Sequence, residues 1–281
     1  MKRTTPFHYL LLCLLVLSGS VFASVTEDKE ECKDKCQYKD FKDIVVPVKR
    51  NHFEILGALG GAKLDAGNST LGVTSAETDT LVQTNENDWN TPGAQLGVGY
   101  VYYFRHAHRY SCHVQWFPSI EPELNLYYLS SNSIDGDVWR FNSSAFNELT
   151  YDMPFHSTRL MLDAALTIMS YKHFSAFAIG GIGNAWSRIG YSDKDKSGTC
   201  SNQNLSLNSK TNSHFAWELG AGVNYAFNYR FGMSFEYLYT NFGNLSTSGS
   251  GTVGTVTTPV ITPAHFSLSS QTALLGLNVA V

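Results

Sequence analysis

The chain has 281 residues, of which 16% are charged, and its formal net charge is −4 at pH 7. This mild negative charge excludes a basic nucleic-acid-binding surface, and the sequence lacks the run of about 18 apolar residues that a helix needs to cross a bilayer. Residues 51–281 carry only 11 basic and 17 acidic residues. Because a soluble surface is roughly 25–35% charged, much of the surface of this part is not expected to face water.

The first 23 residues have the pattern of a secretory signal peptide. Lys2 and Arg3 precede the apolar run 9–17, and Ala23 ends a short stretch that suits a signal peptidase. The apolar run is too short for a membrane-spanning helix. We therefore predict that residues 1–23 are removed on export.

Residues 24–50 differ in composition from the rest of the chain. They contain seven acidic and seven basic residues in 27 positions. Such a dense mixture of charges is typical of a solvated tail or a short polar helix, and a binding element is the alternative. We predict a charged N-terminal segment that lies in the periplasm.

From residue 51 onward, apolar and polar side chains alternate with a period of two, which is typical of β-strands. The clearest runs, 215–227 and 231–240, are joined by three residues and predict a hairpin. Gly and Ala fill both faces of the runs 53–61 and 174–186, so the sequence does not decide their facing. The eight predicted strands lie within residues 53–61, 96–102, 120–128, 160–168, 174–186, 215–227, 231–240 and 275–281.

The segments between these strands alternate in length. Short connections lie near 170–173 and 228–230, and a somewhat longer one lies around 105–113. Long loops on the outside and short turns on the periplasmic side are typical of membrane β-barrels. We predict an all-β fold, an eight-stranded antiparallel transmembrane β-barrel over 51–281 with both termini in the periplasm. The long polar segments, expected to be extracellular loops, are 62–92, 130–156, 188–213 and 243–264.

A soluble lipocalin-like barrel also has eight alternating strands, but it turns its polar face outward. Here the polar face is rich in small residues, which suits a crowded interior. Aromatic residues such as Trp217, Phe227 and Tyr239 lie toward strand ends, where an interfacial girdle forms in a membrane. These features favour the membrane barrel.

Three runs carry a resemblance to known families: GAQLGVGYVYYF from residue 93, ELGAGVNYAFNYRFGMSFEYLY from residue 218, and TALLGLNVAV from residue 272. Together with the eight alternating strands, they resemble the OmpA-like and opacity-protein-like outer-membrane barrel families. The resemblance implies a Gram-negative outer-membrane location, contact with lipids and lipopolysaccharide, and assembly by the barrel assembly machinery. These families typically end on an aromatic residue, whereas this chain ends on Val281, so we expect a less usual insertion signal.

The alternation places a polar cluster inside the barrel. With one cation against five acids, two interpretations stay open: a polar plug in which Arg159 bridges its neighbours, or a narrow, water-filled pore that prefers cations. Absence of channel events in a planar bilayer would contradict the pore. The cluster consists of Glu121, Glu123, Arg159, Asp163, Glu218 and Glu236.

Four cysteines remain after removal of the signal peptide. The predicted topology places Cys200 outside and Cys32, Cys36 and Cys112 in the periplasm, and a disulfide cannot span a bilayer. We therefore predict a disulfide among Cys32, Cys36 and Cys112. A zinc site built from Cys32, Cys36 and a histidine is an alternative, but the spacing does not match a closed tetrahedral set.

The pattern predicts no catalytic, cofactor-binding or metal-binding residues. The histidines lie mostly at strand ends and in connections, and spacing alone assembles no Ser-His-acid group on one rim. Because a barrel scaffold leaves recognition to its loops, we predict a non-enzymatic surface protein with a structural or adhesive role and a host or surface ligand at the loops. The alternatives are the small pore and a lipid-modifying enzyme.

Overall fold

The computed structural model describes residues 51–74, 77–85, 87–104, 114–197, 204–254, 256–259 and 262–281. The predicted signal peptide 1–23, the charged segment 24–50 and all four cysteines of the mature chain lie outside these residues. The expectations for them, including the disulfide among Cys32, Cys36 and Cys112, stay predictions.

Within the described residues the protein is a β-structure with two short 3₁₀ helices. The elements are β1 (His52–Asp65), β2 (Ser69–Gly72), β3 (Thr78–Gln83), β4 (Thr91–Tyr103), β5 (Gln115–Trp116), β6 (Ser119–Trp139), η1 (Arg140–Asn142), η2 (Ser144–Phe146), β7 (Leu149–Tyr171), β8 (Phe174–Asp195), β9 (Leu205–Ala226), β10 (Phe231–Ser246), β11 (Ser250–Val253), β12 (Val256–Pro259) and β13 (His265–Ala280). No helix in this part of the chain is long and apolar enough to cross a membrane.

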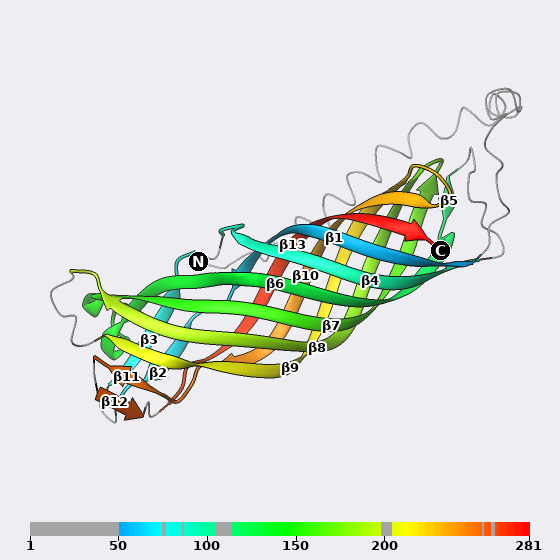
Figure 1. The fold of residues 1–281 in the computed structure, drawn as a ribbon. Coiled ribbons are helices and arrows are strands. Elements are labelled where there is room, and N and C mark those ends of the chain that lie inside the picture. Colours follow the sequence, from blue (N-terminus) through cyan, green and yellow to red (C-terminus); the bar gives the residue numbers. More distant parts are fainter. Residues whose placement is uncertain are drawn as a thin grey trace, which may run out of the picture. The chain divides into compact units, whose positions relative to one another are not determined.

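Eight strands form a closed antiparallel ring in the order β1, β4, β6, β7, β8, β9, β10 and β13. The ring closes at β1, where Gly57 lies opposite Leu96 of β4 on one side and Leu277 of β13 on the other. Figure 1 shows β1 in blue directly beside β13 in red. The predicted eight-stranded antiparallel barrel is confirmed.

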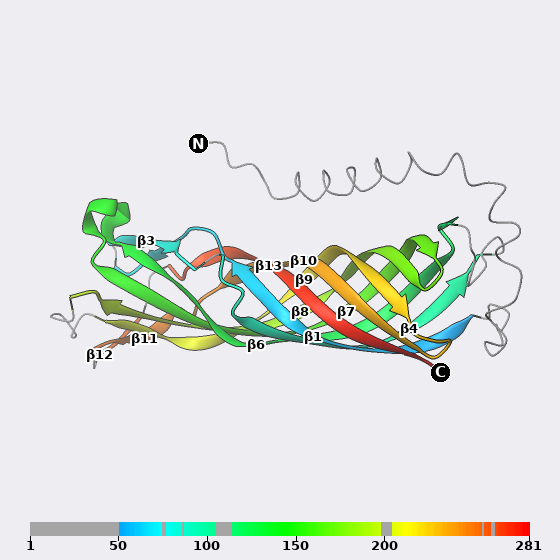
Figure 2. The same ribbon diagram turned by 90° about the horizontal axis from the view of Figure 1, so that it is seen from above.

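The two ends of the barrel differ. At the turn end, residues 172–173 join β7 to β8, residues 227–230 join β9 to β10, and β1 begins where β13 ends. The opposite end, which we call the loop end, carries η1, η2 and the small strands β2, β3, β11 and β12 (Figure 2). The predicted alternation of long and short connections therefore corresponds to two distinct ends.

The outer face of the ring carries an apolar band near the turn end. Leu96, Leu162 and Leu277 point outward and are 62%, 59% and 62% exposed. In water, such a band around a whole barrel would be an extreme apolar surface, whereas in lipid it is the expected face.

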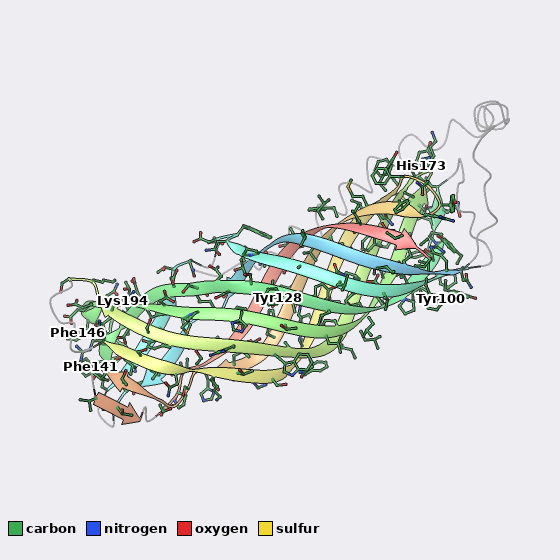
Figure 3. All side chains as sticks on the ribbon, viewed as in Figure 1. Tyr100, Tyr128, Phe141, Phe146, His173 and Lys194 are labelled. Atoms are coloured by element: carbon green, nitrogen blue, oxygen red, sulfur yellow. The ribbon has the colours of Figure 1, made fainter. Side chains whose placement is uncertain are left out.

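Aromatic side chains flank this apolar band on both sides. Phe53 and Tyr100 pair at the turn end with ring centroids 4.9 Å apart, and Trp217 and Tyr239 pair on the other side at 5.6 Å. Figure 3 places Tyr100 near the turn end and Tyr128 about halfway along the barrel. Aromatic side chains are enriched at the two interfaces between membrane and water. The two levels of aromatic residues therefore mark the two edges of the membrane-spanning part.

Four strands are much longer than a bilayer crossing requires. β6, β7, β8 and β9 have 21, 23, 22 and 22 residues, whereas a tilted strand crosses a bilayer in about 9–11 residues. In each of these four strands the half nearer the loop end extends beyond the membrane-spanning half of the barrel (Figure 2). The barrel therefore continues into water as a β-sheet extension.

Along β7 the chemistry of the two faces reverses between these halves. Outward positions change from Leu162 in the band to exposed Thr150 at the loop end. Inward positions change from the charged Asp163 to the buried aromatic side chains of Phe155 and Tyr151, which are 0% and 3% exposed. The loop-end extension therefore has an ordinary water-soluble arrangement, with an apolar core inside and polar residues outside.

The bounds predicted for the long loops were wrong for this reason. Much of 130–156 and of 188–213 is strand, and the connections between these strands are only 140–148 and 196–204. Irregularities in pairing between Leu129 and Asn132, and between Ile189 and Tyr191, also break the period of two. Where the outward residues of a strand become polar and the alternation of apolar and polar residues is interrupted, the sequence pattern predicts a loop.

A lysine scan along β7 tests the position of the membrane band. Leu162→Lys is expected to lower the free energy of unfolding by about 2–4 kcal/mol, because the ammonium would face lipid near the midplane. Thr150→Lys on the same strand, facing water, is expected to change it by less than about 0.5 kcal/mol. Urea titration of both variants in lipid vesicles measures the difference, and equal effects would contradict the assignment.

Candidate functional sites in the lumen and at the loop-end tip

The middle of the lumen is a layer of charged and aromatic side chains around Arg159. The Arg159 guanidinium lies 3.7 Å from Glu218 Oε2 and above the ring of Tyr127, with 4.5 Å between Cζ and the ring centroid. Asp163 is not paired with Arg159; its Oδ2 accepts hydrogen bonds from Asn125 Nδ2 at 2.7 Å and from the Tyr127 hydroxyl at 3.3 Å. Arg159, Asp163 and Glu218 are each at most 2% exposed.

Glycines on neighbouring strands make room for these side chains. A methyl group at Gly181 would collide with Asp163 Oδ1, and one at Gly97 would collide with the Asn125 side chain. Gly181 lies directly opposite Asp163 across the β7–β8 pair. The glycines of the inner face therefore leave the space that the polar and charged side chains of the neighbouring strands occupy.

A second polar layer lies nearer the turn end, where Glu121 and Glu123 of β6 and Glu236 of β10, on opposite sides of the ring, line the same cavity. Glu123 Oε2 accepts a hydrogen bond from Asn125 Nδ2 at 2.7 Å, and Glu236 Oε1 accepts one from the Ser234 hydroxyl at 3.0 Å. The structure thus distributes the six predicted cluster residues over two layers.

Glu54 is a lumen residue that sequence reasoning missed. Its carboxylate contacts His52 Nε2 at 2.8 Å and accepts a hydrogen bond from Asn278 Nδ2 at 2.9 Å. The facing of 53–61 was undecided because Gly and Ala fill both faces, but the polar Glu54 between Phe53 and Ile55 was an available signal. With Glu54, the described lumen places six carboxylates around one internal cation, Arg159.

Apolar side chains fill the lumen beyond the Arg159 layer. Phe242 stacks its ring under the Arg159 guanidinium at 5.3 Å and meets Phe155 edge-on, with centroids 6.0 Å apart. Toward the loop end the filling continues with fully buried side chains such as Ile134 and Ile189. The polar layers therefore connect to the turn end and are covered by an apolar core on the other side.

The loop-end tip is the connection between β6 and β7, which is folded into η1 and η2. Arg140 forms an ion pair with Glu77, with 2.7 Å between Nη2 and Oε1, and the Phe141 N–H donates to Asp79 Oδ1 at 3.1 Å. Phe141 and Asn142 have φ values of 54° and 55°, in the left-handed region. Such backbone costs about 1–3 kcal/mol per residue and persists only where surrounding contacts impose it.

Two aromatic side chains are exposed on this tip. Phe141 and Phe146 are 52% and 47% exposed and contact each other edge-on, with centroids 5.9 Å apart. Figure 3 shows both at the loop end. The alternation of the strands did not predict this pair, because it lies in a connection whose conformation depends on β3.

Two buried carboxylates lie beneath the tip. Burial raises the pKa of Asp193 to about 6, even though Asp193 accepts hydrogen bonds from the Leu205 N–H at 2.6 Å and the Tyr191 hydroxyl at 3.2 Å. Burial likewise raises the pKa of Asp79 to about 6. The negative charge of Asp79 also raises the pKa of Asp193, and that of Glu77 raises the pKa of Asp79, while the positive charge of Arg140 lowers both pKa values.

A closed ring with an apolar, aromatic-flanked outer band and a polar lumen defines a transmembrane β-barrel of the bacterial outer membrane. The chain belongs to the outer membrane protein beta-barrel domain family, which matches residues 53–256. The predicted family and the outer-membrane location are confirmed by this match.

Several solved structures are similar to the chain at low identity. Neisserial surface protein A is 10% identical and has a TM-score of 0.42, with 83% of this chain and 100% of that chain covered. Ail, the attachment invasion locus protein of Yersinia pestis, is 12% identical with a TM-score of 0.38 and the same coverage. The outer membrane protease OmpT from Escherichia coli is 8% identical with a TM-score of 0.44, covering 82% and 97%. No curated protein sequence matches the chain.

The buried carboxylate Asp193 makes the stability of the loop end depend on pH. Its folded-state pKa of about 6 lies above the ordinary value of 3.8, so the folded state binds the proton more tightly and is stabilised as the pH falls from 7.5 to 5.0. Integrated over this range, the gain is about 1 kcal/mol. Because Asp79 contributes in the same way, urea titrations at both pH values should show a gain that is about 1 kcal/mol larger in the wild type than in Asp193→Asn; equal gains in the two proteins would contradict the assignment.

Proposed function

We propose that this protein contacts a partner surface, of a host cell or a solid support, through its loop end, and that it has no enzymatic role. The observation that carries the proposal is the exposed pair Phe141 and Phe146 on an ordered tip. Aromatic side chains supply large contact area at low entropic cost, and interfaces depend on a few such anchors.

The tip is held in place before any partner arrives. Arg140 is tied to Glu77, and at the neighbouring strand end Lys196 Nζ donates to Asn147 Oδ1 at 2.8 Å and pairs with Asp137. Beneath it, the apolar core makes the strand extension rigid. Preorganisation reduces the entropy lost on binding, which supports a recognition role for the tip.

The proposed orientation places the loop end outside the cell and the turn end, with both termini, in the periplasm. An even number of strands brings the start of β1 and the end of β13 to the same end. Short turns lie on the periplasmic side of bacterial outer-membrane barrels, which supports this choice. The proposal includes a signal peptide at 1–23 and a charged periplasmic segment at 24–50.

The double variant Phe141→Ala/Phe146→Ala tests the contact role. Cells displaying the wild-type protein should be retained on epithelial monolayers or on polystyrene, and retention by the double variant should fall about thirtyfold or more, because an aromatic hot spot contributes roughly 2 kcal/mol or more. Val256→Ala, which removes an apolar side chain that is 62% exposed in another loop-end hairpin, is the matched control.

All three proteins must show equal surface amounts and the same heat-dependent gel shift of a folded barrel. Retention that is unchanged in the double variant, or that falls equally in the Val256→Ala control, would contradict a role for the tip.

We further propose that the lumen does not conduct ions, against the pore interpretation of the sequence. The support is the apolar core between the Arg159 layer and the loop end, in which Phe155 and Phe242 are 0% exposed. Purified folded protein in a planar bilayer is therefore expected to give no unit conductance steps in potassium chloride, with a general porin as the positive control. Reproducible cation-selective steps would contradict the proposal.

A further inference from the structure

The turn-end side of the lumen contains a cavity that the loop-end tip does not involve. Its volume is about 110 Å³. A single water molecule needs roughly 10–15 Å³ by a comparable measure, so several waters or one small, narrow ion fit, whereas a drug-sized molecule does not. We call this cavity the vestibule; its inner wall is formed by Glu54, Glu121, Glu123, Asn224, Glu236 and Asn278.

Four buried atoms on this wall have no hydrogen-bond partner among the described residues. They are Glu121 Oε1, Asn224 Oδ1, Glu236 Oε2 and Asn278 Oδ1. Glu236 and Asn278 are each only 7% exposed. All four atoms are acceptors, and burying a polar atom without a partner costs free energy. A ligand that satisfied these four atoms would therefore have to supply hydrogen-bond donors.

The inner wall of the vestibule also has an excess of acidic over basic side chains. Glu121 lies within electrostatic range of Glu54, Glu123 and Glu236. Arg159, the cation of the lumen interior, lies against Glu218 in the next layer. Buried charges of one sign require a compensating charge or protonation.

Basic residues occur at the exposed mouth of the vestibule. The Lys172 ammonium lies over the ring of Tyr171 and the Arg230 guanidinium over that of Tyr229, each 5.2 Å from the centroid, and His173 lies beside them. Charges on an exposed rim are screened by salt over about 8–10 Å. They therefore do not compensate the buried carboxylates on the inner wall.

We propose that the vestibule binds a linear aliphatic diammonium or polyammonium ion. An ammonium group brings three donors and a positive charge, which matches four unpartnered acceptors on an acidic wall. A narrow alkyl chain fits the small volume. A divalent metal ion is a poorer match, since the described residues contain no group of three or more His, Cys, Asp or Glu side chains arranged to hold one.

Calorimetric titration of the mature chain, folded in a neutral detergent, tests this site with three compounds. Putrescine is expected to bind with one-to-one stoichiometry, whereas its uncharged analogue 1,4-butanediol and magnesium chloride are not. Glu121→Gln/Glu236→Gln should weaken putrescine binding about tenfold or more, because charge-assisted hydrogen bonds are lost. The matched control Asp65→Asn/Asp88→Asn removes two charges outside the vestibule and should leave the affinity unchanged.

Absence of putrescine binding, equal binding of the diol, preferential binding of magnesium, or an unchanged affinity in Glu121→Gln/Glu236→Gln would each overturn the proposal. If the double variant lacks the heat-dependent gel shift of a folded barrel, the single variants Glu121→Gln and Glu236→Gln replace it, and each must weaken binding. These results are independent of the surface-contact role, because the titration involves no partner at the loop end.

Discussion

The pairing of β1 with β13 is the interaction on which the rest of the structure depends. In the hydrocarbon core no water can satisfy a backbone N–H or C=O, and each unpaired group costs several kcal/mol. An open eight-stranded sheet would leave two such edges in lipid. The register from Glu54 opposite Ala280 to Asp65 opposite Ser269 removes both edges at once.

Closure determines what happens to the side chains. Once the ring is shut, alternate residues must enter a lumen that is just wide enough to be filled by side chains. In the membrane-spanning half the lumen holds charged groups, and glycines such as Gly97 and Gly181 give them room. Because Arg159 is the cation of this interior, the carboxylates around it are satisfied unevenly, and the vestibule retains unpartnered acceptors.

The same strands pass through two solvents. Where lipid lies outside, the outer face is apolar and the lumen is polar; where water lies outside, the faces exchange character and the lumen becomes an apolar core. This core gives the loop-end tip a rigid base. It also separates the polar layers from the loop end, so the exposed aromatic tip and the vestibule occupy opposite ends of one barrel.

Much of the fold was predictable from single residues and their spacing. The eight strands, the outward facing of residues such as Leu96 and Leu277, and the inward facing of Arg159 and Glu236 all follow from a period of two with one apolar face. The predicted loop bounds failed at Ser130–Ser131 and near Gly190, because irregular pairing shifts the period there while the two faces exchange chemistry. Glu54 was missed because the rest of its run, residues 57–61, is mostly Gly and Ala on both faces and does not fix the facing of the strand.

The sequence by itself determined that the chain forms a closed membrane barrel, since alternation, connection lengths and low charge all reflect local properties of the strands. Tertiary structure alone decided which acceptors in the lumen remain unpartnered, and how Glu77 and Asp79 hold Arg140 and Phe141 at the tip. These contacts join residues that are about 60 or more positions apart. Their geometry depends on the register around the ring, which no local pattern specifies.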